Sequence, residues 1–166
     1  DNDTKFVKPN NISFSKIKKK ELPISAEISY KAHQISNDYQ GYPDLDSLEN
    51  RINLEKLLFQ EVYGKVVKPA CLFLKQNNNI VGSCTVVEIS CWGYEKVPWI
   101  FDICILPKFQ GQRLGSLLFN KVLSVLYKQN YPIVGLAVTK SNKNALHIYQ
   151  KLNFTFVEEF YEFGSP

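Results

Sequence analysis

The sequence predicts a single α/β domain in which helices pack on a mixed, mostly antiparallel sheet. Two stretches with helical spacing of apolar residues come first, three strand-like runs follow, and helix and strand patterns then alternate to the end. At 166 residues the chain can form one core, because a protein of this length buries roughly 70% of the surface of its unfolded chain. Residues 1–166 contain no internal repeat and no linker, so we expect one domain.

The first part of the chain is predicted to form an arm and two helices. Residues 1–21 are polar with short apolar pieces, which indicates an extended arm or an edge strand. Residues 23–38 lack glycine and favour a helix, residues 38–46 are rich in turn formers, and Ser47 or Asp46 can cap a second helix that runs to Tyr63. The predicted inner faces are Ile24, Ile28, Ala32 and Ile35 in the first helix, and Leu48, Ile52, Leu57 and Leu58 in the second.

The middle of the chain is predicted to form three strands. Residues 70–75 and 80–90 are apolar and β-branched, and the polar residues between them favour an antiparallel hairpin. Residues 99–106 form a third, more continuously apolar run that Pro107 ends.

An amphipathic helix follows and ends near Asn130, and residues 133–138 suit a central strand buried on both faces. Residues 154–163 are predicted to close the sheet as a last strand. The predicted inner face of the helix between these strands is Ala145, Ile148, Tyr149 and Leu152.

Charge and apolar run length exclude two classes of function. The net charge of +4 and the pI near 8.8 are only mildly basic, so we expect no nucleic-acid partner. The longest apolar stretches fall far short of the ~20 residues that cross a bilayer, so we expect no membrane span.

The cysteines and histidines do not form a metal-binding pattern. The four cysteines show no Cys-x-x-Cys spacing and the two histidines are not paired, so we expect no metal site. Thiols within apolar strand-like runs are usually buried and inert, which favours a reducing compartment and a cytoplasmic protein. The cysteines are Cys71, Cys84, Cys91 and Cys104.

The stretch that carries chemistry joins the strand at 99–106 to the following helix through a glycine-bearing loop. Exposed amides and the positive end of the helix dipole at such a junction favour a phosphate group. Gly111 and Gly115 give Gly-x-x-x-Gly rather than the dinucleotide fingerprint, and no Gly-Lys-Ser/Thr triplet occurs. The loop therefore predicts an anion site of another kind.

A second motif follows on the next helix. Asn142 stands at the mouth of a loop, Ala145 three residues later, Tyr149 four residues after that, and Phe154 just beyond the helix. Together the two motifs, over residues 70–160, resemble the signature of the GNAT superfamily of N-acetyltransferases. The chain departs from that signature at Arg113 and at Asn153, where the family usually has glycine. Asn is the next best residue for a left-handed helix end.

The resemblance implies a three-layer α/β/α fold whose sheet is splayed between the fourth and fifth strands, here 99–106 and 133–138. It implies acetyl-CoA as cofactor, with residues 70–163 as the cofactor-binding core and residues 22–64 on the acceptor side. The implied pantetheine contacts are Ile103, Cys104, Ile105, Leu106, Asn142 and Ala145. The implied pyrophosphate loop is Gln110, Gly111, Gln112, Arg113, Leu114, Gly115 and Ser116.

The implied reaction is N-acetyl transfer by direct attack of a primary amine on the thioester in a ternary complex. Tyr149 would protonate the leaving thiolate, and the Ile105 amide would hold the oxyanion. The base that takes the amine proton is sought among Glu88 and Asp102, with Glu95 as a weaker third. Each of these also has a plain reading as a solvated charge at a strand end.

The acceptor is open at this stage. Tyr39 and Tyr42 lie in the loop that borders the acceptor cleft in this family, and they are the candidate substrate contacts. The family often has a further strand beyond the sixth, so an open cleft or a homodimer that completes it is expected. A small amine and a protein amine both fit. The alternatives are an acyl-CoA-binding sensor without turnover and transfer of a longer acyl group.

Overall fold

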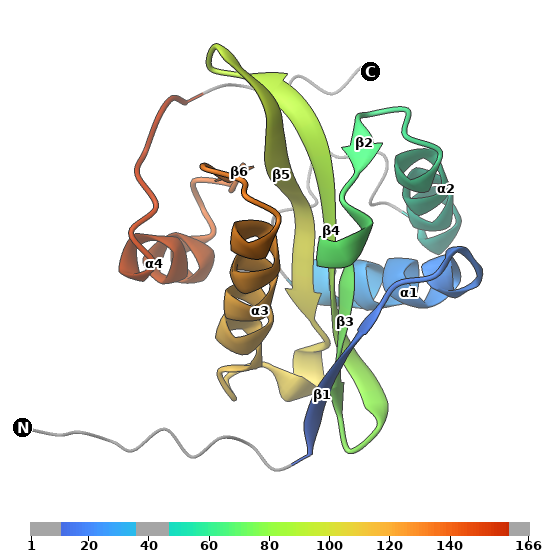
Figure 1. The fold of residues 1–166 in the computed structure, drawn as a ribbon. Coiled ribbons are helices and arrows are strands. Elements are labelled where there is room, and N and C mark those ends of the chain that lie inside the picture. Colours follow the sequence, from blue (N-terminus) through green and yellow to red (C-terminus); the bar gives the residue numbers. More distant parts are fainter. Residues whose placement is uncertain (1–10, 36–46, 160–166) are drawn as a thin grey trace, which may run out of the picture.

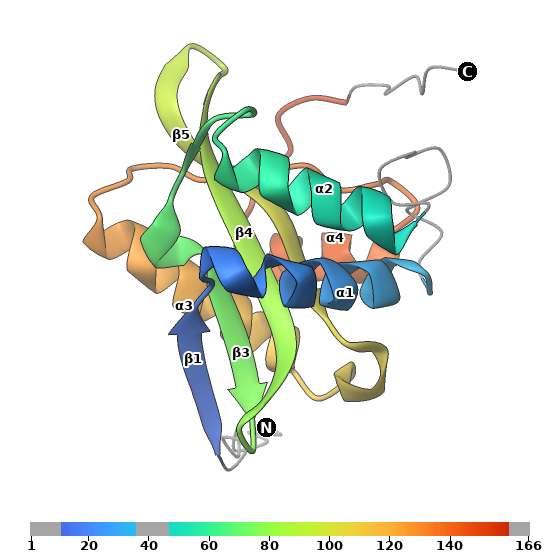
Figure 2. The ribbon, with the colours of Figure 1, turned by 90° about the vertical axis from the view of Figure 1, so that its right-hand side faces the viewer.

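The structure, a computed structural model, describes residues 11–35 and 47–159. It contains a six-stranded sheet with the order β1-β3-β4-β5-β6, and β2 pairs with β4 beside this path. Helices α1 and α2 cover one face of the sheet, and α3 and α4 cover the other (Figures 1 and 2). The predicted α/β architecture with three layers is confirmed.

The predicted hairpin is present, and its second strand and the strand that follows it extend further than expected, whereas its first strand begins two residues later. Asn77 and Asn78 both have positive φ, as a two-residue hairpin turn requires, and Asn tolerates this conformation well. Trp92 and Gly93 form a similar turn between β4 and β5. The strands are β1 Ile12–Lys16, β2 Lys65–Val66, β3 Leu72–Gln76, β4 Asn79–Cys91, β5 Tyr94–Ile105 and β6 Gly135–Leu136.

The sheet opens between β5 and β6, which are the fourth and fifth strands of the prediction. These strands run parallel and pair only through Trp99 with Gly135 and Ile100 with Leu136. Opposite β4, Thr85 pairs with Asp102 but Val86 pairs with Ile100, so Phe101 is an extra residue in a β-bulge. A bulge bends and twists its strand. Beyond Ile100, β5 has no strand on its β6 side among the described residues.

Two predictions about the C-terminal strands were wrong. The central strand over 133–138 has only two residues, because β5 leaves its neighbour after Ile100 and later residues find no ladder partner. Residues 154–159 are not a strand, and residues 160–163 lie outside the described part. Phe154 still packs on the core, but Phe156 is 81% and Val157 is 55% exposed, so the residues after Phe154 have no buried face. Side chains attach it instead, through a 2.9 Å hydrogen bond from Trp92 to Glu158.

Helices α1 (Leu22–His33) and α2 (Leu48–Phe59) begin where predicted, but α1 ends before residue 38 and α2 before Tyr63, and their inner faces differ from the prediction. Ile24 and Ile35 are exposed, and so are Leu48 and Leu57. The buried positions include polar side chains, which a hydrophobic pattern assigns to solvent. They are Leu22, Ser25, Ala26, Ile28, Ser29 and Ala32 in α1, and Arg51, Leu54, Glu55, Leu58 and Phe59 in α2.

Helix α3 (Leu114–Lys128) buries the apolar stripe predicted for it, including Leu118 and Val122 against β4 and β5. Helix α4 (Lys143–Lys151) packs more lightly, since none of its residues is fully buried. No helix in the described ranges is long and apolar enough to span a membrane.

Candidate active site

The open edge of β5 presents backbone groups that no strand uses. The Leu106 amide donates to the Val81 carbonyl on the β4 side at 2.8 Å. Because backbone groups alternate along a strand, the amides of Ile103 and Ile105 point toward the open edge. On that edge the Gln110 side chain donates to the Ile105 carbonyl at 2.9 Å, which fixes the end of β5 against the following loop.

The loop between β5 and α3 is shaped for an anion. Gly111 has φ +75° and a Cβ there would meet nothing within 4 Å, so open space lies in front of this backbone. Arg113 is the N-cap of α3 in the left-handed conformation, its side chain makes no cap hydrogen bond, and the first helical turn contains no acidic residue. The first intrahelical bond joins the Leu117 amide to the Arg113 carbonyl. The helix dipole and the preceding amides therefore favour a phosphate group.

These features fit coenzyme A. The donor set is a row of backbone amides, which suits a pyrophosphate, and the edge of β5 beside it suits an extended amide-bearing chain such as pantetheine. At Gly115 a Cβ would lie 3.8 Å from Ile105 Cγ1, an ordinary contact, so the protein's own packing does not require glycine there.

The second motif forms the start and one face of α4. The Asn142 side chain accepts a hydrogen bond from the Ala145 amide at 3.1 Å and caps the helix. Tyr149 is half-buried and packs on Phe119 and Phe154, with ring centroids 5.5 and 5.9 Å away. Asn153 ends the helix with φ +61°, as expected for a residue that replaces glycine.

The two acidic residues predicted on the strands lie on opposite faces of the sheet. Glu88 accepts a hydrogen bond from the Tyr131 hydroxyl on the α3 side. Burial and this contact raise the pKa of Tyr131 to about 12. Asp102 points to the α1 and α2 side. Tyr39 and Tyr42 lie outside the described residues.

Asp102 is the centre of a buried polar cluster contributed by both N-terminal helices. It accepts hydrogen bonds from Ser29 Oγ at 2.5 Å and from Arg51 Nη2 at 2.7 Å, and its Oδ1 lies 2.9 Å from His33 Nε2. Burial alone would raise the pKa of Asp102, but Arg51, His33 and Ser29 outweigh it and hold this pKa well below its usual range. The carboxyl group is therefore ionised at neutral pH.

Glu55 is the second carboxyl group of this cluster and is fully buried. Burial raises its pKa to about 7, and Arg51, whose Nη2 lies 3.6 Å from Oε1, offsets only part of this effect. The nearby Asp102 charge raises this pKa further, and neither Glu55 oxygen has a hydrogen-bond partner among the described residues. Glu55 therefore titrates near neutral pH.

Sequence reasoning missed Ser29, His33, Arg51 and Glu55 as site residues. The sequence of α2 does contain a pattern that indicates burial of the charged pair. Arg51 and Glu55 are four residues apart, as are Leu54 and Leu58, so all four lie on one face of the helix. A charged pair between buried leucines is a reason to expect a buried partner charge, here Asp102.

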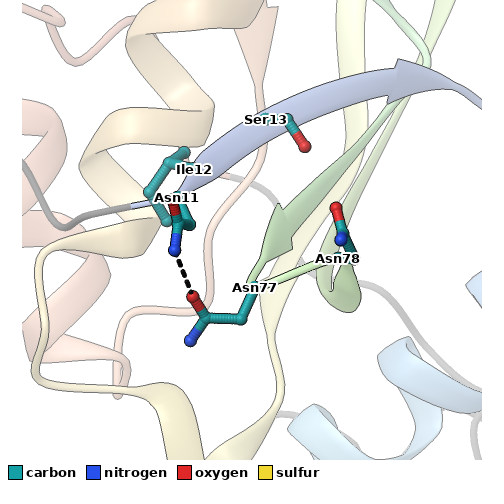
Figure 3. A pocket seen from close by; sticks show the side chains of 5 residues that line it. All are labelled: Asn11, Ile12, Ser13, Asn77 and Asn78. Carbon is teal, nitrogen blue, oxygen red and sulfur yellow. Dashed lines mark hydrogen bonds between the residues drawn. The ribbon is translucent and has the colours of Figure 1, made fainter.

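The surface hollow near β1 lies apart from this chemistry, whereas one cysteine touches it, since Cys104 Sγ lies 3.7 Å from Asp102 Oδ2. Cys71, Cys84 and Cys104 are buried free thiols, and burial raises the pKa of Cys71 to about 12. A hollow of about 400 Å³ is lined by residues of β1 and the β3–β4 turn, where Asn11 donates to Asn77 at 3.1 Å (Figure 3). None of its lining residues belongs to β5, α3 or α4. In the described ranges no group of His, Cys, Asp and Glu is arranged to hold a metal ion.

Comparison with known proteins defines the class that this fold and site belong to. The acetyltransferase (GNAT) family matches residues 31–154, and the chain is a member of it. Enzymes of this family take their acetyl group from acetyl-CoA.

A curated relative from Haemophilus influenzae, the [ribosomal protein bS18]-alanine N-acetyltransferase, is 32% identical over 87 residues. This alignment covers 52% of the chain and 56% of the relative, so the chain spans about half the length of that protein.

Two solved structures share the fold. A protein of Pyrococcus horikoshii OT3 superposes with a TM-score of 0.71 at 21% identity and covers 91% of this chain and 93% of its own. The PaiA N-acetyltransferase of Thermoplasma acidophilum, in complex with coenzyme A, has a TM-score of 0.68 at 16% identity, with 91% and 93% covered.

Proposed function

We propose that this protein transfers the acetyl group of acetyl-CoA to a primary amine by direct attack in a ternary complex. The observation that carries the proposal is the open edge of β5 beyond Ile100, which leads directly into the amide-lined start of α3. The GNAT family supplies the reaction class.

Two segments would bind different parts of acetyl-CoA: the end of β5 and the loop that leads into α3. Residues Ile103–Leu106 would pair with the pantetheine arm through the backbone groups of the open edge. Residues 110–116 would bind the pyrophosphate, with the Arg113 guanidinium near its charge. Asn142 and Ala145 would border the arm from the side of α4. When bound, acetyl-CoA supplies an activated acyl group that an amine can attack without a covalent enzyme intermediate.

The residues around the open edge would assist the transfer itself. The amides of Ile103 and Ile105 point to the edge and would stabilise negative charge on the carbonyl oxygen. Tyr149 would give its hydroxyl proton to the departing thiolate. We expect Tyr149→Phe to keep acetyl-CoA binding and to lower thiol release by about 10²-fold or more. Equal rates for the two proteins would remove Tyr149 from the reaction.

The acceptor is a primary amine that reaches the open edge from the side of α1 and α2. Tyr39 and Tyr42 follow α1 in the chain and are proposed to contact it. The relative from Haemophilus influenzae is named for an alanine of a ribosomal protein. A peptide that begins with alanine is therefore the first acceptor to test, followed by polyamines and aminoglycosides.

Thermal unfolding with acetyl-CoA tests the cofactor, and release of free thiol tests the reaction. Acetyl-CoA at 100 times its Kd should add ~2.7 kcal/mol to the free energy of unfolding. Thiol release with one amine class would identify the acceptor class. Stabilisation without release from any amine would instead favour an acyl-CoA sensor, and propionyl- and succinyl-CoA should be poorer donors than acetyl-CoA.

A matched pair of variants in α3 tests the loop. Gly115→Ala adds a methyl group that the protein can accommodate, so the free protein should keep its stability, while acetyl-CoA should stabilise it much less. Ser124→Ala lies on an exposed position of the same helix and should behave as wild type. If acetyl-CoA stabilises both variants equally, the pyrophosphate does not approach the backbone at residue 115.

We place the protein in the cytoplasm, since its cysteines are free thiols. A homodimer that completes the acceptor side stays a prediction, and sedimentation of the protein with and without acetyl-CoA would measure it.

A further inference from the structure

We infer that His33 accepts the proton of the amine substrate and that Asp102 is the residue that positions it. The inference rests on the proposed function and deepens it. It is carried by the 2.9 Å contact between His33 Nε2 and Asp102 Oδ1 and by the place of that contact in the sheet.

The pair lies at the level where the sheet opens. Asp102 is two residues beyond Ile100, the last β5 residue that pairs with β6. Because Phe101 is the extra residue of the bulge, Phe101 and Asp102 both face α1 and α2. His33 is the last residue of α1, which packs on β4 and β5 (Figure 2). The histidine therefore stands on the acceptor side, next to the bulge.

Solvent exposure distinguishes His33, which a substrate can contact, from the less exposed charged residues around it. The His33 side chain is 26% exposed, whereas the Asp102, Arg51 and Glu55 side chains are 10%, 3% and 0% exposed. Asp102 also accepts hydrogen bonds from Ser29 and Arg51, so its oxygens are already engaged. A buried carboxylate with these partners is a poor proton acceptor, and the imidazole beside it is the better one.

The contact with Asp102 also determines which nitrogen of the His33 ring is basic. A carboxylate accepts hydrogen bonds and does not donate them, so His33 Nε2 must carry the hydrogen of this contact. In the neutral imidazole Nδ1 then carries the lone pair and takes the proton, directly or through a water molecule. Asp102 on β5 contacts the ring directly, and Arg51 on α2 lies behind it, 2.7 Å from Asp102 Oδ2 and 3.6 Å from Glu55 Oε1.

The protons balance over the whole transfer. The amine reaches the site as an ammonium ion, and His33 removes one proton so that the nitrogen lone pair can form the C–N bond. The C–S bond breaks, and the thiolate takes a proton from Tyr149. The nitrogen loses its second proton, which restores the Tyr149 hydroxyl through solvent, and His33 releases its proton to water. The products are an amide, a thiol and one proton.

The pH dependence of kcat/KM tests this assignment, with the amine that gives turnover in the thiol-release assay. His33→Gln should lower kcat/KM by about 10²- to 10⁴-fold near neutral pH. Its rate should continue to rise with pH until the amine itself loses its proton. In His33→Ala, added imidazole should restore part of the rate in a saturable way. His147→Gln, which removes the exposed histidine of α4, is the matched control and should keep the wild-type profile.

A variant of Asp102 tests whether this residue positions His33. The outcomes also distinguish a failure of the His33 assignment from a failure of the acetyltransferase proposal. Asp102→Asn should move the acidic limb of the pH profile of kcat/KM. Lower rates with an unchanged profile and no rescue by imidazole would make His33 a structural residue and overturn the inference, while the acetyltransferase proposal would stand. No thiol release by the wild-type protein with any amine would overturn both.

Discussion

The two faces of the central sheet are built by different means. Under α3 the buried side chains are apolar, and Leu118, Phe119 and Val122 are at most 2% exposed. Under α1 and α2 the apolar residues surround Arg51 and Glu55, which are buried, and Asp102, whose side chain is 10% exposed. The α3 face follows the hydrophobic pattern of its sequence, whereas the other face depends on specific pairing between side chains.

The sheet face under α1 and α2, with its charged residues, is called the polar face. The largest expected loss of stability comes from removing its cation, Arg51. Arg51→Met leaves two buried carboxyl groups without their positive partner, and it should lower the free energy of unfolding by about 3–5 kcal/mol. Urea unfolding measures this change. Lys31→Met removes the cation of the exposed pair with Glu27 and should cost at most ~1 kcal/mol. Similar losses in the two variants would contradict the comparison.

The apolar face should lose almost as much from a single truncation. Leu118 is fully buried between α3 and the sheet, so Leu118→Ala should cost about 2–5 kcal/mol through lost burial and a cavity. Tyr127→Ala, at an 80% exposed position of the same helix, is the control and should change stability by less than ~1 kcal/mol. The losses in the two α3 variants should not depend on pH, unlike changes on the polar face.

Glu55 makes the stability of the polar face depend on pH. Its pKa is raised by burial to about 7, so the folded state binds a proton more strongly than the unfolded chain does. The resulting stabilisation is complete below pH ~4.5 and is lost as the pH rises through about 7, on the order of 3 kcal/mol in total. Asp102 acts in the opposite direction and at lower pH, since its pKa is lowered.

Urea unfolding at pH 5 and pH 8 measures the effect of Glu55. Wild type should be more stable at pH 5, and Glu55→Gln should lose most of this difference. If the difference persists in Glu55→Gln, another group is responsible for it.

The smallest expected effect concerns the cap of α4. Asn142→Ala removes the acceptor for the Ala145 amide and should cost ~1 kcal/mol, whereas Asn142→Asp should keep most of this stability. Thermal unfolding measures the cap, and titration with acetyl-CoA measures whether the same side chain also contacts the cofactor. A full loss of cofactor affinity in both variants would assign that contact to the amide group.

The sequence predicted the packing of α3 on one face of the sheet better than the packing of α1 and α2 on the other. The Asn77–Asn78 turn, the left-handed Asn153 and the stripe of α3 could be predicted, because each depends on local conformation or on simple burial. The inner faces of α1 and α2 could not, because the pattern assigns Ser29, Arg51 and Glu55 to solvent. Only a partner distant in sequence, Asp102, makes their burial favourable.

The site was predicted unevenly for similar reasons. The loop at 110–116 is contiguous in sequence, and its glycine spacing and the following helix are visible there. The contact of His33 with Asp102 joins residues 69 positions apart, and no local pattern reports it. The predicted length of β6 was wrong because the ladder between β5 and β6 ends where β5 bends. The bulge at Phe101 determines the position of that bend.

Because the bulge consists of one extra residue, deleting that residue can change the shape of β5, which no substitution can do. Phe101 is the residue without a partner on β4, and its neighbours Ile100 and Asp102 already face opposite sides of the sheet. Deleting Phe101 would therefore keep every pairing with β4 and the orientation of each remaining side chain. It would remove the bend, together with the ring contact of Phe101 to Tyr63. A chain shortened by this one residue would have a straighter β5, and it would show how much of the cofactor site comes from the shape of the strand alone.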